Sequence, residues 1–127
     1  MSLPDVLIVD DDQLLRTLLK DALQDVPCTV REAANGDLAL SLIEQATPAV
    51  VILDLIMPGK SGLEVLKLLK ARKVTSKVIV VSALDSEKLV QSAMADGANG
   101  YLVKPFHPLD VQNVVRAALE GSKGAPP

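Results

Sequence analysis

Short apolar runs alternate along the chain with longer segments in which apolar residues recur at helical spacing. The runs lie at residues 6–9, 28–34, 49–55, 77–83 and 100–105. Most are rich in Val and Ile, as expected of strands buried on both faces, and 28–34 is partly polar. The helical segments follow at 12–26, 37–46, 63–73, 86–97 and 108–121. The pattern predicts five strands, each followed by a helix.

The first helical segment shows this spacing over three turns. Its apolar stripe consists of Leu14, Leu15, Leu18, Leu19, Ala22 and Leu23. Asp12 stands directly before the stripe, where an N-cap residue is expected. We therefore expect Asp12 to cap the helix and the whole stripe to face the core.

Strands that alternate with helices imply a parallel sheet covered on both faces. Right-handed crossovers restrict such a chain to a few doubly wound arrangements. The predicted fold class is α/β, a (βα)5 three-layer sandwich. Ligands of such open sheets bind beyond the carboxyl ends of the strands, so the residues that follow each strand are the candidates for function.

Composition narrows the function classes. A length of 127 residues suits one domain, and 49% hydrophobic residues is ordinary for a folded protein. At a net charge of -3, the chain lacks the excess of basic residues that is typical of nucleic-acid-binding domains. The chain has one cysteine and no signal peptide. No apolar run approaches the roughly 18 residues that a membrane span needs. We expect a cytoplasmic domain that binds neither nucleic acid nor membrane.

Charged and hydroxyl side chains stand at the ends of four predicted strands. Asp10 and Asp11 follow the first, and Asp54, Ser82 and Lys104 end the third, fourth and fifth. Two carboxylates about 4 Å apart repel by roughly 4 kcal/mol at an effective dielectric near 20, so three of them need a cation. No His or Cys lies nearby in the pattern, and oxygen ligands favour Mg²⁺ over Zn²⁺. The sequence predicts a magnesium site.

These motifs together resemble the receiver domain of bacterial two-component response regulators. The matching residues are Asp10–Asp11, Asp54 with "MPGKSG" close behind it, Ser82–Ala83, Tyr101 and Lys104–Pro105–Phe106. The resemblance covers residues 4–121 and leaves 122–127 as a linker or tail. It implies a flavodoxin-like fold with strand order 2-1-3-4-5 and a cis bond between Lys104 and Pro105.

The resemblance also implies a chemistry. Asp54 would take a phosphoryl group from a phosphohistidine in a Mg²⁺-dependent reaction, forming an acyl phosphate. The ion would be held by Asp10, Asp11 and Asp54 together with the backbone carbonyl of Ile56, and Asp10 would act through a bound water. The phosphodonor would be a histidine kinase or a histidine phosphotransfer protein.

A switch in surface shape would follow phosphorylation. Lys104 and Ser82 would contact the phosphoryl oxygens, and Tyr101 would move from an exposed to a buried position as Ser82 is drawn in. The surface of the fourth helix, fifth strand and fifth helix would change, and an unidentified effector or output domain would bind it. The resemblance also allows a homodimer that forms on phosphorylation.

Two other functions compete with this interpretation. A Mg²⁺-dependent phosphohydrolase with an aspartyl nucleophile usually carries a second Asp two residues on, where this chain has Ile56. A flavin- or nucleotide-binding domain would need a glycine-rich phosphate loop, which is missing.

Ile56 and Leu84 flank the path of a water that would attack the phosphate. Both side chains are apolar and cannot orient this water, which predicts slow hydrolysis of the phosphate. We expect a phosphoacceptor switch, not an enzyme with its own metabolic substrate.

Overall fold

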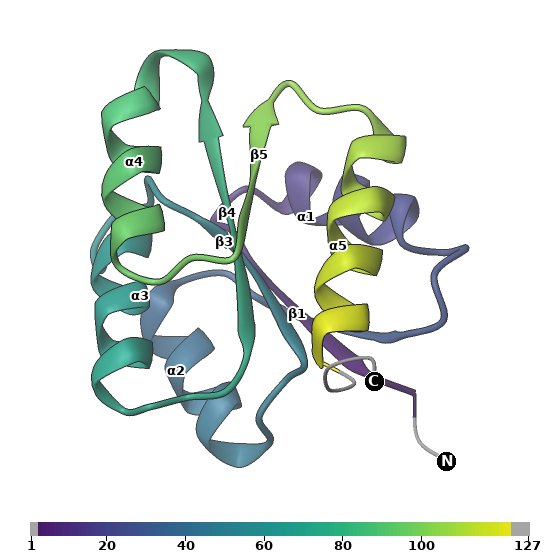
Figure 1. The fold of residues 1–127 in the computed structure, drawn as a ribbon, viewed down its shortest axis with the longest axis horizontal. Coiled ribbons are helices and arrows are strands. Elements are labelled where there is room, and N and C mark those ends of the chain that lie inside the picture. The colour runs from purple at the N-terminus through teal and green to yellow at the C-terminus, as the bar shows by residue number, and fades with distance from the viewer. Residues whose placement is uncertain (1–2, 123–127) are drawn as a thin grey trace.

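The computed structural model describes residues 3–122, apart from the side chains of Leu84 and of residues 121 and 122. Strands and helices alternate along this part of the chain (Figure 1). The strands are β1 (Asp5–Val9), β2 (Thr29–Ala33), β3 (Val50–Asp54), β4 (Lys77–Ala83) and β5 (Gly100–Lys104). The helices are α1 (Gln13–Ala22), α2 (Gly36–Gln45), α3 (Gly62–Ala71), α4 (Glu87–Ala95) and α5 (Pro108–Ser122). Every element predicted from the hydrophobic pattern is therefore present.

Most element boundaries differ from the predicted ones by one or two residues, and the largest difference is in the first helix. The first helix ends at Ala22 instead of continuing to residue 26, and a proline at position 27 disfavours helical backbone in the residue before it. The last helix includes Ser122, one residue beyond the predicted domain end. The rest of the predicted tail, 123–127, lies outside the described residues.

The strands form one parallel sheet in the order β2-β1-β3-β4-β5, as predicted. In the register of the sheet, Val9 of β1 pairs with Leu53 of β3, and Asp54 pairs with Val81 of β4. Lys104 of β5 pairs with Ala83 of β4. The carboxyl ends of β1, β3, β4 and β5 therefore lie along one edge, which is the edge that the sequence singled out.

Helices cover both faces of the sheet and make two separate hydrophobic cores. In Figure 1, α1 and α5 lie on one side of the sheet and α2, α3 and α4 on the other. Alternate residues of β1 divide accordingly: Val6 and Ile8 pack with α1 and α5, and Leu7 and Val9 pack with α2 and α3. No helix in the described part of the chain is long and apolar enough to cross a bilayer.

The predicted core stripe of α1 is only partly buried, and this corrects the sequence analysis. Leu19 and Leu23 lie in the core, as does Ala22, but Leu14 is 65% exposed and Leu18 is 47% exposed. Leu18 precedes Leu19 by one residue and so lies about 100° around the helix from it. The apolar stripe is wider than the surface that the sheet and α5 can cover, so its flank faces solvent.

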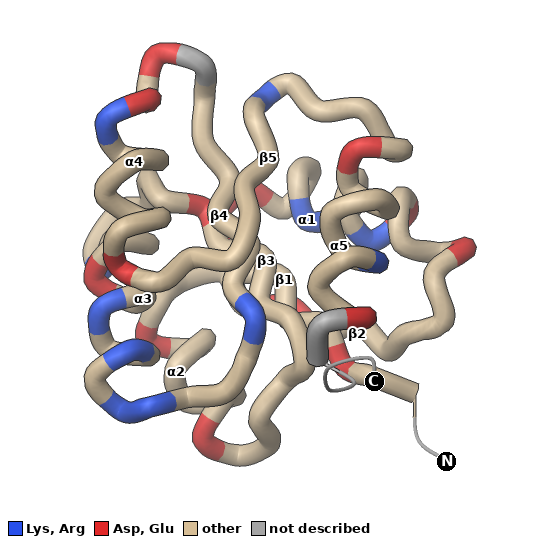
Figure 2. Tube along the Cα trace, viewed as in Figure 1, with Lys and Arg blue, Asp and Glu red and all other residues tan. Residues whose placement is uncertain are grey.

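Three of the helices begin at a side-chain cap. Asp12 accepts a hydrogen bond from the backbone N–H of Leu14 at 2.9 Å, as predicted. Asn35 caps α2 and Ser61 caps α3 in the same way. Figure 2 shows Lys and Arg gathered around the C-terminal end of α3, where cations interact favourably with the helix dipole.

Gly62, the first residue of α3, packs directly against the backbone at the end of β3. A Cβ atom on Gly62 would lie 2.0 Å from the carbonyl oxygen of Asp54 and 2.7 Å from Cα of Leu55. The N–H of Gly62 donates to the carbonyl of Leu55 at 3.1 Å. The absence of a side chain thus lets α3 begin against the backbone that carries Asp54.

We predict that Gly62→Ala lowers the free energy of unfolding by about 2 kcal/mol or more, because the clash involves backbone that cannot move away. Gly36→Ala is the matched control at the first residue of α2. There the nearest atoms to the new Cβ are side-chain atoms, Cγ2 of Val65 at 2.8 Å and Cβ of Lys60 at 3.2 Å, and we expect a smaller loss because no backbone atom has to move. Urea denaturation of both variants measures the difference, and an equal loss in the two would contradict the packing argument.

Candidate metal centre

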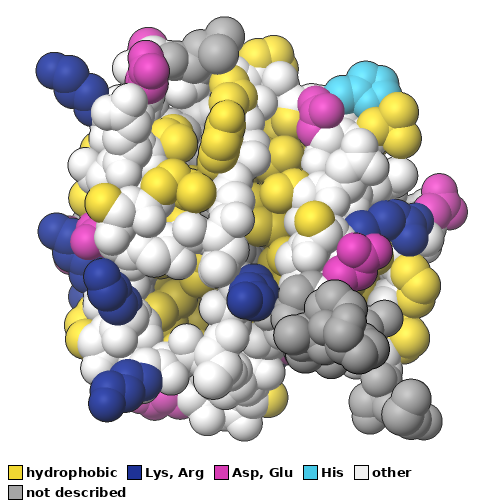
Figure 3. All heavy atoms as spheres, viewed as in Figure 1, with side chains coloured by type: hydrophobic (Ala, Val, Ile, Leu, Met, Phe, Trp, Pro, Cys, Tyr) yellow, Lys and Arg dark blue, Asp and Glu magenta, His cyan; other side chains and the backbone are white. Residues whose placement is uncertain are grey.

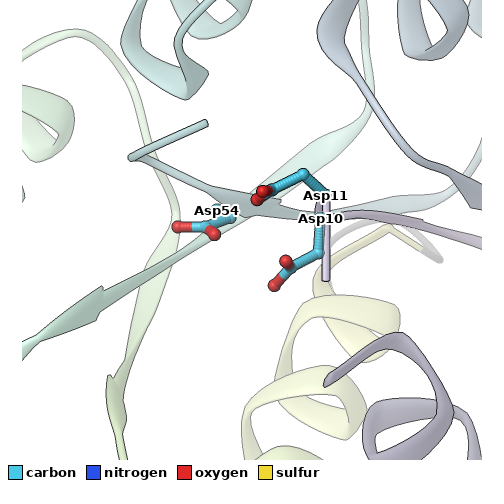
Figure 4. Close-up of side chains that lie close together, drawn as sticks. All are labelled: Asp10, Asp11 and Asp54. Carbon is cyan, nitrogen blue, oxygen red and sulfur yellow. The ribbon is translucent and has the colours of Figure 1, made fainter. Parts of the chain in front are cut away.

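Three carboxylates meet at the carboxyl edge of the sheet. Asp10 and Asp11 directly follow β1, and Asp54 is the last residue of the neighbouring strand β3. One oxygen from each carboxylate lies within 4.8 Å of the others. Figure 4 shows the three side chains directed toward a common space. The structure thus brings together three predicted ligands that are up to 44 residues apart in sequence.

Lys104 joins this cluster from β5. Its Nζ lies 3.3 Å from Oδ2 of Asp54, and the Asp54 carboxylate is almost fully buried. β5 is separated from β3 by β4, so the long lysine side chain crosses the end of one strand to reach the carboxylate. The ammonium neutralises part of the negative charge that the three aspartates create.

Backbone N–H groups fix the two buried carboxylates. Oδ1 of Asp10 accepts from the N–H of Asp12 at 2.9 Å, and Oδ1 of Asp54 accepts from the N–H of Ile56 at 3.1 Å. Both acidic side chains are nearly inaccessible, with 2% of Asp10 and 5% of Asp54 exposed. Asp11 is exposed. The site therefore has two immobilised carboxylates and one that faces solvent.

Burial raises the pKa of Asp10 above its ordinary value of 3.8. The N–H of Asp12 opposes this shift, the charge of Asp54 adds to it, and the ammonium of Lys104 opposes it. A carboxylate removed from water loses solvation of its ionised form, so ionised Asp10 destabilises the folded state. A cation bound beside Asp10 would offset that loss.

The donor set fits a hard divalent cation. Among the described residues, the cluster of Asp10, Asp11 and Asp54 is the one group of three or more acidic, His or Cys side chains close enough to share an ion. All its side-chain donors are oxygens, and Mg²⁺ binds to one or two carboxylates while it keeps several waters. The exposed side at Asp11 leaves room for such waters.

Of the remaining predicted residues, Ser82 and Ile56 lie next to the cluster, and Tyr101 lies three residues before Lys104 in β5. Ser82 of β4 is buried one position beyond Val81, the sheet partner of Asp54, and its hydroxyl donates a long hydrogen bond, 3.5 Å, to the carbonyl of Ala83. Tyr101 of β5 is exposed, and so is the side chain of Ile56. The bond between Lys104 and the proline that follows it is cis, as the resemblance implied.

Comparison with known proteins identifies the family. Residues 6–116 match the family model of the response regulator receiver domain. The chain belongs to the response regulator receiver domain family. It is 36% identical to the nitrate/nitrite response regulator NarL of Escherichia coli K12 over 118 residues, which are 91% of this chain and 55% of NarL. It is 38% identical to the chemotaxis protein CheY of Listeria monocytogenes over 102 residues, 80% of this chain and 86% of that protein.

Solved receiver structures agree with this assignment. The receiver domain of NtrX from Brucella abortus superposes with a TM-score of 0.87 at 31% identity, covering 91% of this chain and 98% of that one. CheY4 of Vibrio cholerae gives 0.85 at 31% identity, covering 93% and 100%. The receiver chain spans about half the length of NarL. The comparisons give no support to the phosphohydrolase alternative.

Two residues with structural roles at the receiver site were not predicted from the sequence. The guanidinium of Arg16 donates to the carbonyl of Asp10 at 2.6 Å and pairs with Glu32 of β2 at 3.1 Å. Gly62 makes room for the backbone of Asp54. An ion pair between residues 16 positions apart has no signature in the hydrophobic pattern. The glycine stood inside the quoted motif "MPGKSG" without an assigned role.

We predict that Asp10→Asn raises the free energy of unfolding by about 1 kcal/mol at pH 7 in metal-free buffer. Asn keeps the oxygen that accepts from the N–H of Asp12 and removes the unfavourable charge. Because the folded-state pKa is raised, ionisation of Asp10 destabilises the fold as the pH rises from the ordinary value of 3.8 through the raised value. The advantage of the variant should therefore disappear below pH 3.8.

Thermal and urea unfolding in EDTA measure this effect. Asp12→Asn is the matched control, since it removes the same charge from an exposed position and Asn caps a helix as well as Asp does. Added Mg²⁺ should stabilise the wild-type protein more than Asp10→Asn, because an ion that binds only the native state stabilises it. A less stable Asp10→Asn protein at pH 7 in EDTA would refute the desolvation argument.

Proposed function

We propose that this receiver domain is a phosphorylation-controlled switch in which Asp54 accepts a phosphoryl group from a phosphohistidine. One observation carries the proposal: a buried carboxylate at the sheet edge, paired with Lys104 at 3.3 Å, faces two more carboxylates within 4.8 Å. Structural ion pairs rarely need two additional acidic groups beside them, because the repulsion lowers stability. The arrangement suits a group that receives charge and a cation that neutralises it.

In the proposed step, an oxygen of ionised Asp54 attacks the phosphorus of phosphohistidine. The new O–P bond forms as the P–N bond breaks, and the imidazole nitrogen leaves with the electron pair of that bond. The product is an acyl phosphate on Asp54 and a free histidine side chain. No base is required, since the carboxylate has no proton to lose. Phosphoryl transfer of this kind depends on positioning and on charge neutralisation.

Different residues of this chain would position the reacting groups and neutralise their charge. Asp10, Asp11 and Asp54, with the backbone carbonyl of Ile56, would hold Mg²⁺. When bound, this ion neutralises negative charge on the phosphoryl oxygens. The N–H of Ile56 holds Oδ1 of Asp54 at 3.1 Å, which orients the carboxylate. Lys104 already contacts Oδ2 and would bind the phosphoryl oxygens with its ammonium, while Ser82 would donate its hydroxyl.

The switch would act through β5. The long hydrogen bond of Ser82 holds its hydroxyl weakly, so a phosphoryl oxygen can compete for it. Tyr101 is exposed and lines a hollow of about 550 Å³ with Met94, Val90 and Val103 between α4 and β5. Figure 3 shows hydrophobic side chains along this part of the surface. Movement of Tyr101 into the sheet edge would change the surface that an effector or output domain binds.

The exposed flank of α1 supports a docking position for the phosphodonor. Leu18 and Leu15 line a hollow together with Lys104, Pro105 and Phe106, so an apolar surface lies beside the reactive carboxylate and its lysine. A histidine kinase or histidine phosphotransfer protein that packs an apolar helix here would present its phosphohistidine to Asp54. We propose a phosphoacceptor role without turnover of a separate metabolic substrate.

The direct test is incubation with phosphoramidate, a small donor with a P–N bond, and Mg²⁺. We expect one phosphoryl group per chain by intact mass spectrometry, and none for Asp54→Asn or in EDTA. Asp37→Asn, which removes an exposed carboxylate on α2, should be modified like the wild type. Phosphorylation of the Asp54→Asn protein would refute the assignment, and continuous release of phosphate in excess over protein would indicate a phosphohydrolase.

We predict slow hydrolysis of the acyl phosphate, because Ile56 and Leu84 cannot orient an attacking water. The loss of the phosphoryl group is followed by mass spectrometry after the donor is removed. An acyl-phosphate half-life of seconds would contradict this prediction.

We predict that Leu18→Arg slows phosphoryl transfer from a phosphohistidine protein by about tenfold, equal to roughly 1.4 kcal/mol of lost docking energy. Uptake from phosphoramidate should be unchanged, because Leu18 does not belong to the carboxylate cluster. Leu38→Arg is the matched control, an exposed leucine on α2. Single-turnover transfer assays compare the three proteins. Equal slowing with both donors would place the effect in the site, and not in docking.

A further inference from the structure

We infer that Arg16 is a positioning residue that aims Asp10 and Asp11 at the bound cation. The inference rests on the proposed magnesium site and adds to it a residue that contacts neither the ion nor the phosphoryl group. Nη1 of Arg16 donates to the backbone carbonyl of Asp10 at 2.6 Å. The Arg16 side chain is 13% exposed, so this contact is largely shielded from water.

The contact fixes the peptide that joins the two acidic residues. The carbonyl of Asp10 and the N–H and Cα of Asp11 lie in one rigid plane. The N–H of Asp10 donates to the carbonyl of Ala33 at 3.1 Å, which extends the pairing of β1 with β2 by one residue. Because the N–H and the carbonyl of Asp10 are both hydrogen-bonded, the backbone direction from Asp10 to Asp11 is fixed. The orientation of the exposed Asp11 side chain depends on this backbone.

A second group holds Arg16 in place and compensates its charge. Nε of Arg16 donates to Oε1 of Glu32 at 3.1 Å, and Lys20 approaches Oε2 of the same carboxylate at 3.4 Å. The planar guanidinium uses two of its donors at once, one for Glu32 and one for Asp10, which a lysine cannot reproduce. Glu32 offsets part of the positive charge of Arg16, and Arg16 contacts a backbone carbonyl and no carboxylate of the cluster. Arg16 therefore orients the acidic cluster without taking the place of the cation.

Arg31 of β2 offers a matched comparison. Like Arg16, it pairs with one carboxylate, here that of Asp5 in β1, and it donates to backbone carbonyls, those of Leu42 and Ala46. Asp5 is five residues from Asp10, about 16 Å along an extended strand. The two arginines therefore make similar stabilising contacts at opposite ends of β1, and Arg16 alone of the pair contacts the acidic site.

The experiment titrates MgCl₂ into the full chain by calorimetry for the wild type, Arg16→Met, Arg16→Lys and Arg31→Met, alongside thermal unfolding. Loss of residues that orient metal ligands typically weakens affinity 10- to 100-fold. We expect Arg16→Met to raise the Mg²⁺ Kd about tenfold or more and Arg16→Lys to raise it less. Arg31→Met should stay within about twofold of the wild type, because distant sites act independently. Both methionine variants remove one positive charge and should lower Tm.

A kinetic readout separates positioning from chemistry. With phosphoramidate, the Mg²⁺ concentration for half-maximal phosphorylation should rise in Arg16→Met, and the rate at saturating Mg²⁺ should return close to the wild-type rate. Unchanged Mg²⁺ affinity in Arg16→Met, or an equal loss in Arg31→Met, would overturn the inference. If Arg16→Met fails to fold, unchanged affinity in Arg16→Lys overturns it instead. Wild-type protein that binds Mg²⁺ but accepts no phosphate would refute the proposed function and leave the role of Arg16 standing.

Discussion

The mutual repulsion of three carboxylates is the constraint on which the rest of this receiver domain depends. A parallel sheet brings the carboxyl ends of β1 and β3 side by side, so Asp10, Asp11 and Asp54 are held within 4.8 Å of one another. At that distance each pair of charges repels by about 3 kcal/mol at an effective dielectric near 20. A folded domain has only about 5–15 kcal/mol of total stability, so the cluster requires compensation.

The compensation comes from elements distant in sequence, and it connects the site to the rest of the molecule. Lys104 brings a positive charge from β5, and backbone N–H groups hold the buried carboxylates. Lys104 and Tyr101 lie on the same short strand, so in the proposed switch a change in charge at Asp54 would act on that strand through Lys104. Arg16 ties the acidic turn to β2 at the other side of the sheet. Strands on either side of β1 and β3 thus support one site.

Basic side chains and the acidic cluster lie at opposite edges of the sheet. The Lys and Arg residues around the end of α3 in Figure 2 lie where the helix returns to the start of β4, away from the acidic cluster. Beside Lys104, the side chains of Leu15 and Leu18 of α1 line an apolar hollow with Pro105 and Phe106. The carboxylate edge therefore combines negative charge, which the proposal assigns to a cation, with an apolar surface, which it assigns to a protein partner. Lys and Arg side chains gather at the opposite edge.

The sequence by itself determined the fold class, the strand ends and the residues that gather there, because strand and helix periods are local properties and parallel strands share one carboxyl edge. It could also place the Asp12 cap, which depends on neighbouring residues alone. Only the tertiary structure decided which flank of the α1 stripe is buried, since the width of the covered surface depends on α5 and the sheet. It also paired Arg16 with Glu32 and set Gly62 against Asp54, since contacts between residues distant in sequence leave no local pattern.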